Sequence, residues 1–222
     1  MMRFPTRLLL ATLMACAGGV ALAAPVTPTF TTFSNLAGAT YGGSGIPTDP
    51  SAITIVGSLT LGLAATQRYV GPNLANDGAG TYYANAGAGL APNLSTWNFD
   101  FYLGNAGGLA GAGMSYALLY DKDAGYNTLE SALASFDLTP FATGTTLQDS
   151  ENMGFAFLAA GFDPTVPGQY SFVLLARNAA GAEVGRSAIN VDVLAVPEPG
   201  SLALLGLGLV GMGALMRRRN KA

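Results

Sequence analysis

The chain has 222 residues, half of them apolar, and ten Lys and Arg against thirteen Asp and Glu give a net charge of −3. It has no histidine and a single cysteine, Cys16. These counts exclude Ser-His-Asp triads, HExxH zinc sites and disulfide frameworks, because each needs residues that the chain lacks.

The N-terminal 23 residues have the layout of a secretory signal peptide. Two arginines precede an apolar run over residues 8–22, and Ala21 and Ala23 form a small-residue cleavage site. A helix of a folded core would not need this order of basic, apolar and small residues. We therefore expect a signal helix over residues 1–23, removed by signal peptidase after Ala23.

A second processing route starts from the same stretch. Leu13-Met14-Ala15-Cys16 resembles a lipobox, in which Cys16 would be lipidated and become the new N-terminus. The residues after Cys16 remain apolar, whereas the linker of a lipoprotein turns polar. Cleavage after Ala23 is the favoured prediction, and it leaves a mature protein without a thiol.

Residues 24–196 form an acidic body. They hold twelve acids against four bases, a net charge of −8, and Lys122 is their one lysine. Nucleic-acid binding needs several cations that neutralise phosphates, and anionic lipid headgroups repel a body of this charge. The composition therefore excludes a nucleic-acid-binding protein.

Short runs of alternating or β-rich residues, separated by Gly, Pro, Asn and Asp, cover the body. In one run Trp97, Phe99 and Phe101 should share a face. The pattern predicts an all-β fold over residues 24–195, a single antiparallel β-sandwich that is Ig-like with Greek-key connections or jelly-roll-like. A β-barrel is the alternative. The expected strands are 52–63, 96–103, 114–120, 153–159, 169–177 and 186–193.

Three connecting segments have their own signals. Residues 178–183 fit the loop of a final β-hairpin, and residues 128–136 fit a short helix or another strand. The Gly-, Ala- and Asn-rich residues 71–95 predict a long surface loop, with ligand binding as a second interpretation.

Oxygen ligands stand at alternate positions after the strand that ends at residue 120. Asp121, Asp123 and Asn127 could bind calcium, which prefers clustered hard oxygen ligands. The spacing departs from that of an EF-hand, because the glycine of this loop is fifth and its glutamate tenth. An ordinary Asp/Gly turn is therefore the alternative, and no other cofactor is expected.

Other carboxylates and aromatic residues suggest weaker hypotheses. Asp149 and Glu151 form a second acidic cluster, and Asp100 lies among aromatic residues. Two carboxylates can hydrolyse a glycosidic bond, but nothing in the sequence pairs these three, so no catalytic residue is predicted. Aromatic residues could stack on sugars if exposed, although strand aromatics usually belong to the core. They are Trp97, Tyr82, Tyr83 and Tyr102.

Three elements follow one another in residues 196–222. Pro197, Glu198 and Pro199 precede 16 uncharged residues at 201–216, and a basic cluster at 217–221 includes Arg217, Arg218 and Arg219. As a helix the uncharged run spans ~24 Å, slightly less than the ~30 Å thickness of a hydrocarbon core. Snorkelling arginines and local thinning of the bilayer can compensate for this difference. We expect a transmembrane helix whose arginines stay in the cytoplasm.

In this order the three elements resemble the PEP-CTERM sorting signal. The resemblance covers residues 196–222 and implies recognition by a membrane exosortase, which would process the chain near Pro197, Glu198 and Pro199 and release or re-anchor the body. It also implies a Gram-negative bacterium that makes exopolysaccharide. The basic residues at both ends agree on one topology, with both termini inside and the body outside.

These features predict a non-enzymatic protein of the cell surface or extracellular matrix, exported through the inner membrane and held there transiently by its C-terminal helix. Exosortase and signal peptidase are its processing partners, and exopolysaccharide is a candidate partner of the body. One alternative is a carbohydrate-binding or adhesion module stabilised by calcium. A more remote alternative is a carboxylate-based hydrolase.

Overall fold

The computed structural model describes residues 24–40, 50–68, 74–158, 161–196 and 209, and almost all of its regular structure is β. The strands are β1 (Thr32–Ser34), β2 (Ser51–Val56), β3 (Leu59–Gln67), β4 (Ala75–Asn76), β5 (Thr81–Asn85), β6 (Trp97–Asn105), β7 (Ser115–Tyr120), β8 (Ala134–Asp137), β9 (Thr146–Glu151), β10 (Gly168–Arg177) and β11 (Glu183–Leu194). Three single-turn 3-10 helices are η1 (Gly111–Gly113), η2 (Glu130–Ala132) and η3 (Thr139–Phe141). The all-β prediction is confirmed.

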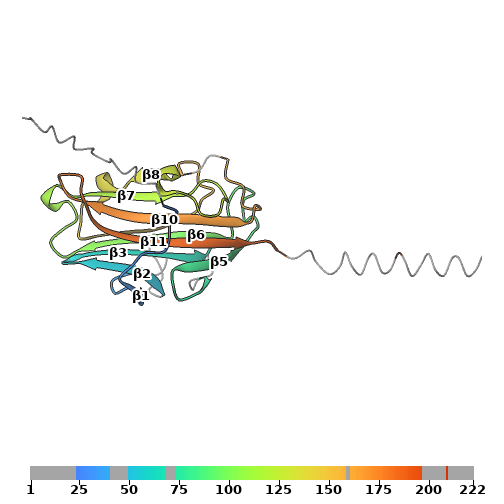
Figure 1. Cartoon of the computed structure of the whole chain (residues 1–222), viewed down its shortest axis with the longest axis horizontal. Helices are drawn as coiled ribbons and strands as arrows, with labels where there is room; N and C mark the ends of the chain where they lie inside the picture. The colour runs from blue at the N-terminus through green and yellow to red at the C-terminus, as the bar shows by residue number, and fades with distance from the viewer. Residues whose placement is uncertain (1–23, 41–49, 69–73, 159–160, 197–208, 210–222) are drawn as a thin grey trace, which may run out of the picture.

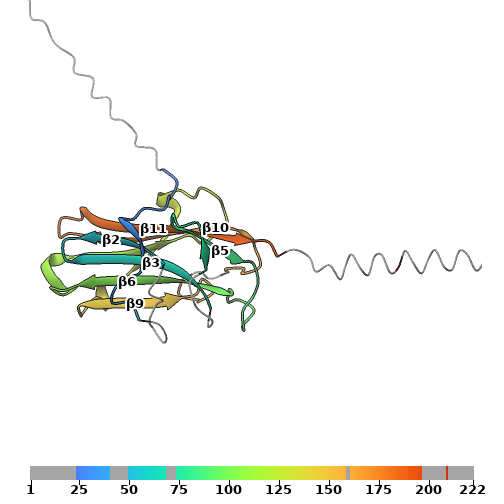
Figure 2. The ribbon, with the colours of Figure 1, turned by 90° about the horizontal axis from the view of Figure 1, so that it is seen from below.

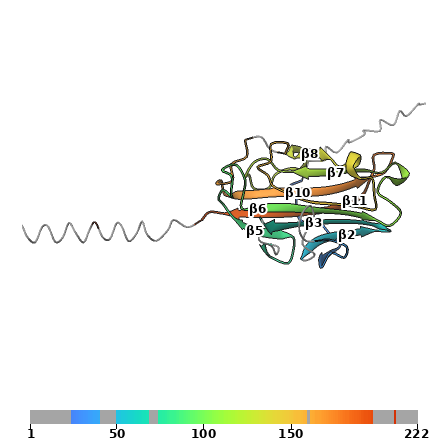
Figure 3. The same ribbon diagram turned by 180° about the vertical axis from the view of Figure 1, so that it is seen from behind.

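The strands form two sheets, in the orders β1-β2-β3-β6-β9 and β4-β5-β11-β10-β7-β8. Figures 1 and 2 show them as two layers of one body. Neighbouring strands are antiparallel except β5 and β11, which run parallel. In Figures 1 and 3, β5 lies at the end of the body where β11 finishes. This parallel pair departs from the purely antiparallel arrangement that the sequence predicts.

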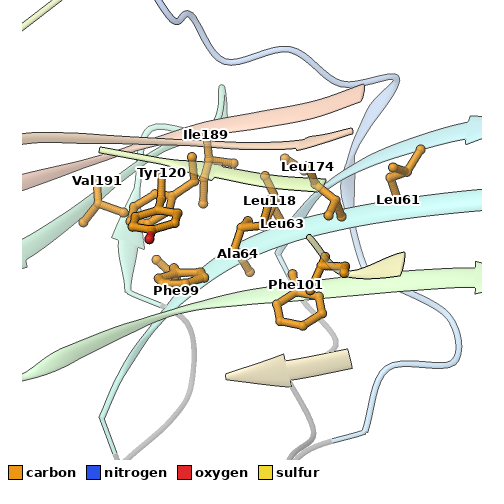
Figure 4. Packing of buried hydrophobic residues seen from close by; sticks show 14 of the residues in the cluster. Leu61, Leu63, Ala64, Phe99, Phe101, Leu118, Tyr120, Leu174, Ile189 and Val191 are labelled. Carbon is orange, nitrogen blue, oxygen red and sulfur yellow. The ribbon is translucent and has the colours of Figure 1, made fainter. Parts of the chain in front are cut away.

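Alternating side chains from both sheets meet between the layers. Trp97, Phe99 and Phe101 of β6 are buried there, as the sequence predicts. Figure 4 shows Phe99 and Phe101 among apolar residues of β7, β10 and β11. The rings of Phe99 and Phe172 stack with their centroids 4.5 Å apart, which ties one layer to the other. Burial of this face supplies the main driving force for folding.

The strand predicted over residues 52–63 is two strands. The chain turns at Gly57 and Ser58, so that β2 and β3 pair as a hairpin. Gly57 has a φ of +61°, a conformation that a glycine adopts without steric cost. The apolar alternation continues through the turn in the sequence, which conceals the break.

Two other predictions were wrong. Residues 153–158 form turns instead of a strand, and the neighbouring strand is the polar β9 at Thr146–Glu151. The described part of the predicted 71–95 loop contains β4 and β5, and Tyr82 of β5 is fully buried. Residues 128–136, for which a helix or a strand was expected, contain η2 and the first part of β8.

Both terminal helices expected from the sequence, over residues 1–23 and 201–216, fall outside the described residues apart from Leu209. Within the described ranges, no helix is both long and apolar enough to cross a bilayer.

Candidate functional site

A cleft opens where the two sheets end in β9 and β8, the outer strands of their respective sheets. Its volume is about 260 Å³, just under the ~300 Å³ at which small-molecule pockets usually begin. The cleft is lined by Phe101, Leu118, Phe136, Leu138, Phe141, Leu147, Asp149, Glu151, Phe157 and Leu158. Eight apolar side chains and two carboxylates therefore share one small space.

The register of β9 places both carboxylates in this cleft. Asp149 pairs with Phe101 and Glu151 pairs with Phe99, and those two phenylalanines point into the core. Because alternate residues of a strand share a face, Asp149 and Glu151 point the same way as their partners. The sequence shows Asp149 and Glu151 as an acidic cluster but does not place it. The structure shows that these two side chains project between the sheets.

Burial makes these two carboxylates less acidic. It raises the pKa of Asp149, although the Ser150 amide donates a 2.8 Å hydrogen bond to Asp149 Oδ1. Burial and then the charge of Asp149 raise the pKa of Glu151 to about 7. Such shifts concentrate at sites that bind or react, although structural networks also cause them.

Phenylalanine rings form the apolar part of the cleft. Phe136 of β8 lies 5.8 Å from the ring of Phe157 and 6.0 Å from that of Phe141, centroid to centroid. Phe141 and Phe157 are each 57 % exposed, so a large part of each side chain is open to solvent. Phe155 continues the row, 5.8 Å from Phe157, and Arg68 lies over its ring at 5.3 Å. Sequence reasoning did not connect these rings because they come from segments that lie far apart in the sequence, and the 153–159 segment was predicted to be a strand.

Asn152 holds the turn that carries Phe155 and Phe157. Its Oδ1 accepts hydrogen bonds from the amides of Ser95 and Gly154, at 3.1 and 3.0 Å. Its Nδ2 donates to the Ser95 and Trp97 carbonyls and to Asn98 Oδ1, at 3.2, 2.9 and 2.9 Å. This fully buried amide joins the end of β9 to the start of β6 and so fixes one wall of the cleft.

Asp100 belongs to the opposite face of the same sheet. It pairs with Ser150, the residue between the two cleft carboxylates, and therefore points away from them. Thr66 Oγ1 donates to Asp100 Oδ1 at 3.3 Å, yet complete burial raises the pKa of Asp100 to about 8. The structure thus brings Asp149 and Glu151 together and keeps Asp100 apart.

The residues predicted to bind calcium lie in the loop after β7. Asp121 is buried, and its Oδ1 accepts a 3.3 Å hydrogen bond from the Asp123 amide. Asp123 Oδ1 accepts from the Gly125 amide at 2.8 Å, and Asn127 is exposed. Among the described residues, no three acidic, His or Cys side chains gather as they would around a metal ion. Calcium binding by Asp121, Asp123 and Asn127 stays a prediction.

The processing residues flank the folded body. Ala21, Ala23, Pro197, Glu198, Pro199 and the arginines at 217–219 lie outside the described residues. Close to each site the described chain belongs to the folded body: the Val26 amide donates to the Thr128 carbonyl at 3.0 Å, and β11 ends at Leu194. Val196, the last residue described before the motif, is 58 % exposed.

Most of the candidate sugar-stacking aromatics belong to the core. Trp97, Tyr82 and Tyr102 are at most 7 % exposed and cannot present a face to a ligand. Tyr83 is 37 % exposed. The phenylalanines of the cleft, which the sequence did not single out, offer the larger exposed aromatic surface.

Comparison with known proteins identifies the C-terminal segment. The PEP-CTERM protein-sorting motif matches residues 195–219, a range that includes Pro197, Glu198, Pro199 and the arginines at 217–219. No curated protein matches the chain. Among solved structures, the soluble domain of PmoD from Methylocystis sp. ATCC 49242 (Rockwell) aligns at 9 % identity and a TM-score of 0.33, over 64 % of this chain and 96 % of that one. That score establishes no common fold.

Proposed function

We propose that an exosortase processes this chain during export. The premise is that the chain is a PEP-CTERM domain-containing protein with its sorting motif at residues 195–219. Signal peptidase first removes residues 1–23, and the 201–216 helix then holds the chain in the inner membrane. The arginines at 217–219 stay in the cytoplasm. Processing near Pro197, Glu198 and Pro199 delivers the body to the cell surface or the extracellular matrix.

The position of the folded body between the two processing sites carries this proposal. Pro25, two residues after Ala23, already pairs with Leu129 of the body, and the last strand ends three residues before Pro197. Cleavage at either site therefore cuts no strand and exposes no core. The prolines beside Glu198 also favour an extended backbone that a membrane protease can reach.

We further propose that the body is non-enzymatic. Asp149 and Glu151 project from one face of a single strand and line the same wall of the cleft. Glycoside hydrolysis needs two carboxyl groups that flank the scissile bond. Two carboxylates on one wall fit binding better than hydrolysis.

The cleft supports a second candidate for the body, a carbohydrate-binding or adhesion module of a Gram-negative bacterium that makes exopolysaccharide. Exposed aromatic rings beside half-buried hydrogen-bond acceptors are typical of ligand sites. Glycan-array binding tests this role, and loss of the signal in Phe141→Ala would assign it to the cleft. A calcium-dependent rise in melting temperature, absent in Asp121→Asn, tests whether calcium stabilises the module.

Cell fractionation tests the sorting proposal. In a strain without exosortase the protein should stay in the inner membrane, whereas cells with the enzyme should present the protein on their surface or release it. An unchanged distribution between the two strains would refute exosortase processing.

A further inference from the structure

We propose that the cleft between β9 and β8 binds an organic ammonium ion carried on an apolar body, with Asp149 and Glu151 receiving the cation and Phe136, Phe141 and Phe157 receiving the apolar part. The inference rests on the proposed role of the body as a binding module and adds the chemistry of the ligand.

The charges of the cleft favour a cation. Asp149 and Glu151 are the charged side chains in its lining, and no Lys or Arg of the described ranges lines it. Each carboxylate loses hydration in this position, and the two repel each other. A hydroxyl of a neutral ligand would leave that repulsion in place, whereas an ammonium group would offset it.

In the described part of the chain, the elements packed around the cleft do not supply such a cation themselves. β6, β7 and β8 present Phe101, Leu118 and Phe136 to the cleft. Asp137, beside Phe136, is exposed and adds negative charge. Arg68 lies at the far end of the phenylalanine row, over Phe155, which does not line the cleft, and its Nη1 donates to Asn98 Oδ1 at 3.0 Å.

The phenylalanines favour an apolar body next to the cation. Phe141 and Phe157 are each 57 % exposed, and covering these rings removes apolar surface from water. The face of an aromatic ring also attracts an ammonium ion. At about 260 Å³ the cleft fits a group the size of a side chain or a single ring.

Phenethylamine and 2-phenylethanol are matched probes for this site, because they differ in the charged amine and share the phenyl ring. Titration of the protein purified from the cells that make it should show the amine binding at least ~10-fold more tightly. Glu151→Gln and Asp149→Asn should each remove most of that preference. Asp163→Asn, which removes an equal charge from an exposed loop, should leave it unchanged.

The pH dependence gives a second readout. Burial and Asp149 raise the pKa of Glu151 to about 7, so Glu151 gains its charge as the pH rises from about 6 to about 8. A primary ammonium stays protonated over that range. Amine affinity should therefore increase several-fold across it, and the increase should vanish in Glu151→Gln.

The outcomes separate this inference from the binding-module proposal. Equal affinity for both probes would overturn the ammonium inference while leaving a ligand cleft. Glycan binding without amine binding would also overturn it, and the module proposal would stand. Self-association of the protein that buries Phe141 and Phe157, with no probe bound, would assign the cleft to a second copy of the chain and contradict the ammonium inference.

Discussion

Asn152 binds Ser95 as a neighbouring strand would, accepting a hydrogen bond from its amide at 3.1 Å and donating one to its carbonyl at 3.2 Å. The two residues are 57 positions apart and both are fully buried. A side-chain amide here satisfies backbone groups that no strand reaches. The wall of the cleft therefore depends on one polar residue.

Replacement of Asn152 by Ala should destabilise the fold by about 3 kcal/mol, because buried backbone groups of Ser95 and Gly154 would lose their partner. Urea unfolding measures the change. Gln148→Ala on the neighbouring β9, where the side chain bonds to Thr40 near the surface, is the control and should cost less than about 1 kcal/mol. Equal losses in the two variants would contradict this role of Asn152.

Alanine substitutions of Phe99 and Phe141 should have different effects, the first on the stability of the fold and the second on ligand binding. Phe99→Ala removes a fully buried ring stacked on Phe172 and should cost about 3 to 5 kcal/mol of unfolding free energy. Phe141→Ala removes a half-exposed ring and should cost less than about 1 kcal/mol while weakening ligand binding in the cleft. A large stability loss from Phe141→Ala would show that this ring serves the fold.

The fully buried Asp100 should make the protein less stable as the pH rises. Its pKa is about 8 in the folded state against an ordinary 3.8, so the folded state keeps a proton that the unfolded state loses between these values. Stability is therefore lost from about pH 4 to about pH 8. Asp100→Asn, which cannot ionise, should gain stability relative to the natural protein over this window, as urea unfolding at about pH 5 and about pH 8 would measure.

Glu151 contributes to the same pH dependence with the same sign, because its pKa is raised to about 7. Glu151→Gln is thus the comparison variant. It should remove only the contribution of Glu151, which lies between about pH 4.5 and about pH 7, and leave that of Asp100. A pH profile unchanged by Asp100→Asn would contradict a buried, protonated Asp100.

Gly154 lies in the turn after Asn152, and its amide donates a hydrogen bond to Asn152 Oδ1. The surrounding backbone leaves no room for a side chain at this position. A Cβ at this position would overlap the carbonyl of Asn93, which is backbone and cannot rotate away. Gly154→Ala should cost about 1 to 3 kcal/mol in thermal or urea unfolding. Gly111→Ala, whose Cβ would meet nothing within 4 Å, is the control and should lie within about 1 kcal/mol of the natural protein.

The sequence predicts the strands that alternate and misses those that do not. β6, β10 and β11 carry apolar residues at every second position, and their predicted ranges lie close to the observed ones. β9 reads TLQDSE, because it is an outer strand whose inward positions beyond Leu147 are carboxylates. Without the pairing to β6, nothing distinguishes it from a polar loop.

The candidate site shows the same limit. Asp149 and Glu151 are recognisable as an acidic cluster. Whether their side chains point between the sheets depends on the register of β9 with β6, which a single sequence does not reveal. Phe136, Phe141 and Phe157 meet them only because β8 and β9 end the two sheets on the same side. The sorting motif, in contrast, consists of consecutive residues, so the sequence alone is sufficient to recognise it.

The intact mass of the mature protein tests the central claim most directly. For the natural chain, mass spectrometry should show a species that begins at Ala24 and ends near Pro197, Glu198 and Pro199. Replacement of all three motif residues by Ala should give a species that retains the 201–216 segment and the arginines. A natural protein that keeps its complete C-terminal segment, or equal C-terminal ends in both proteins, would contradict exosortase processing.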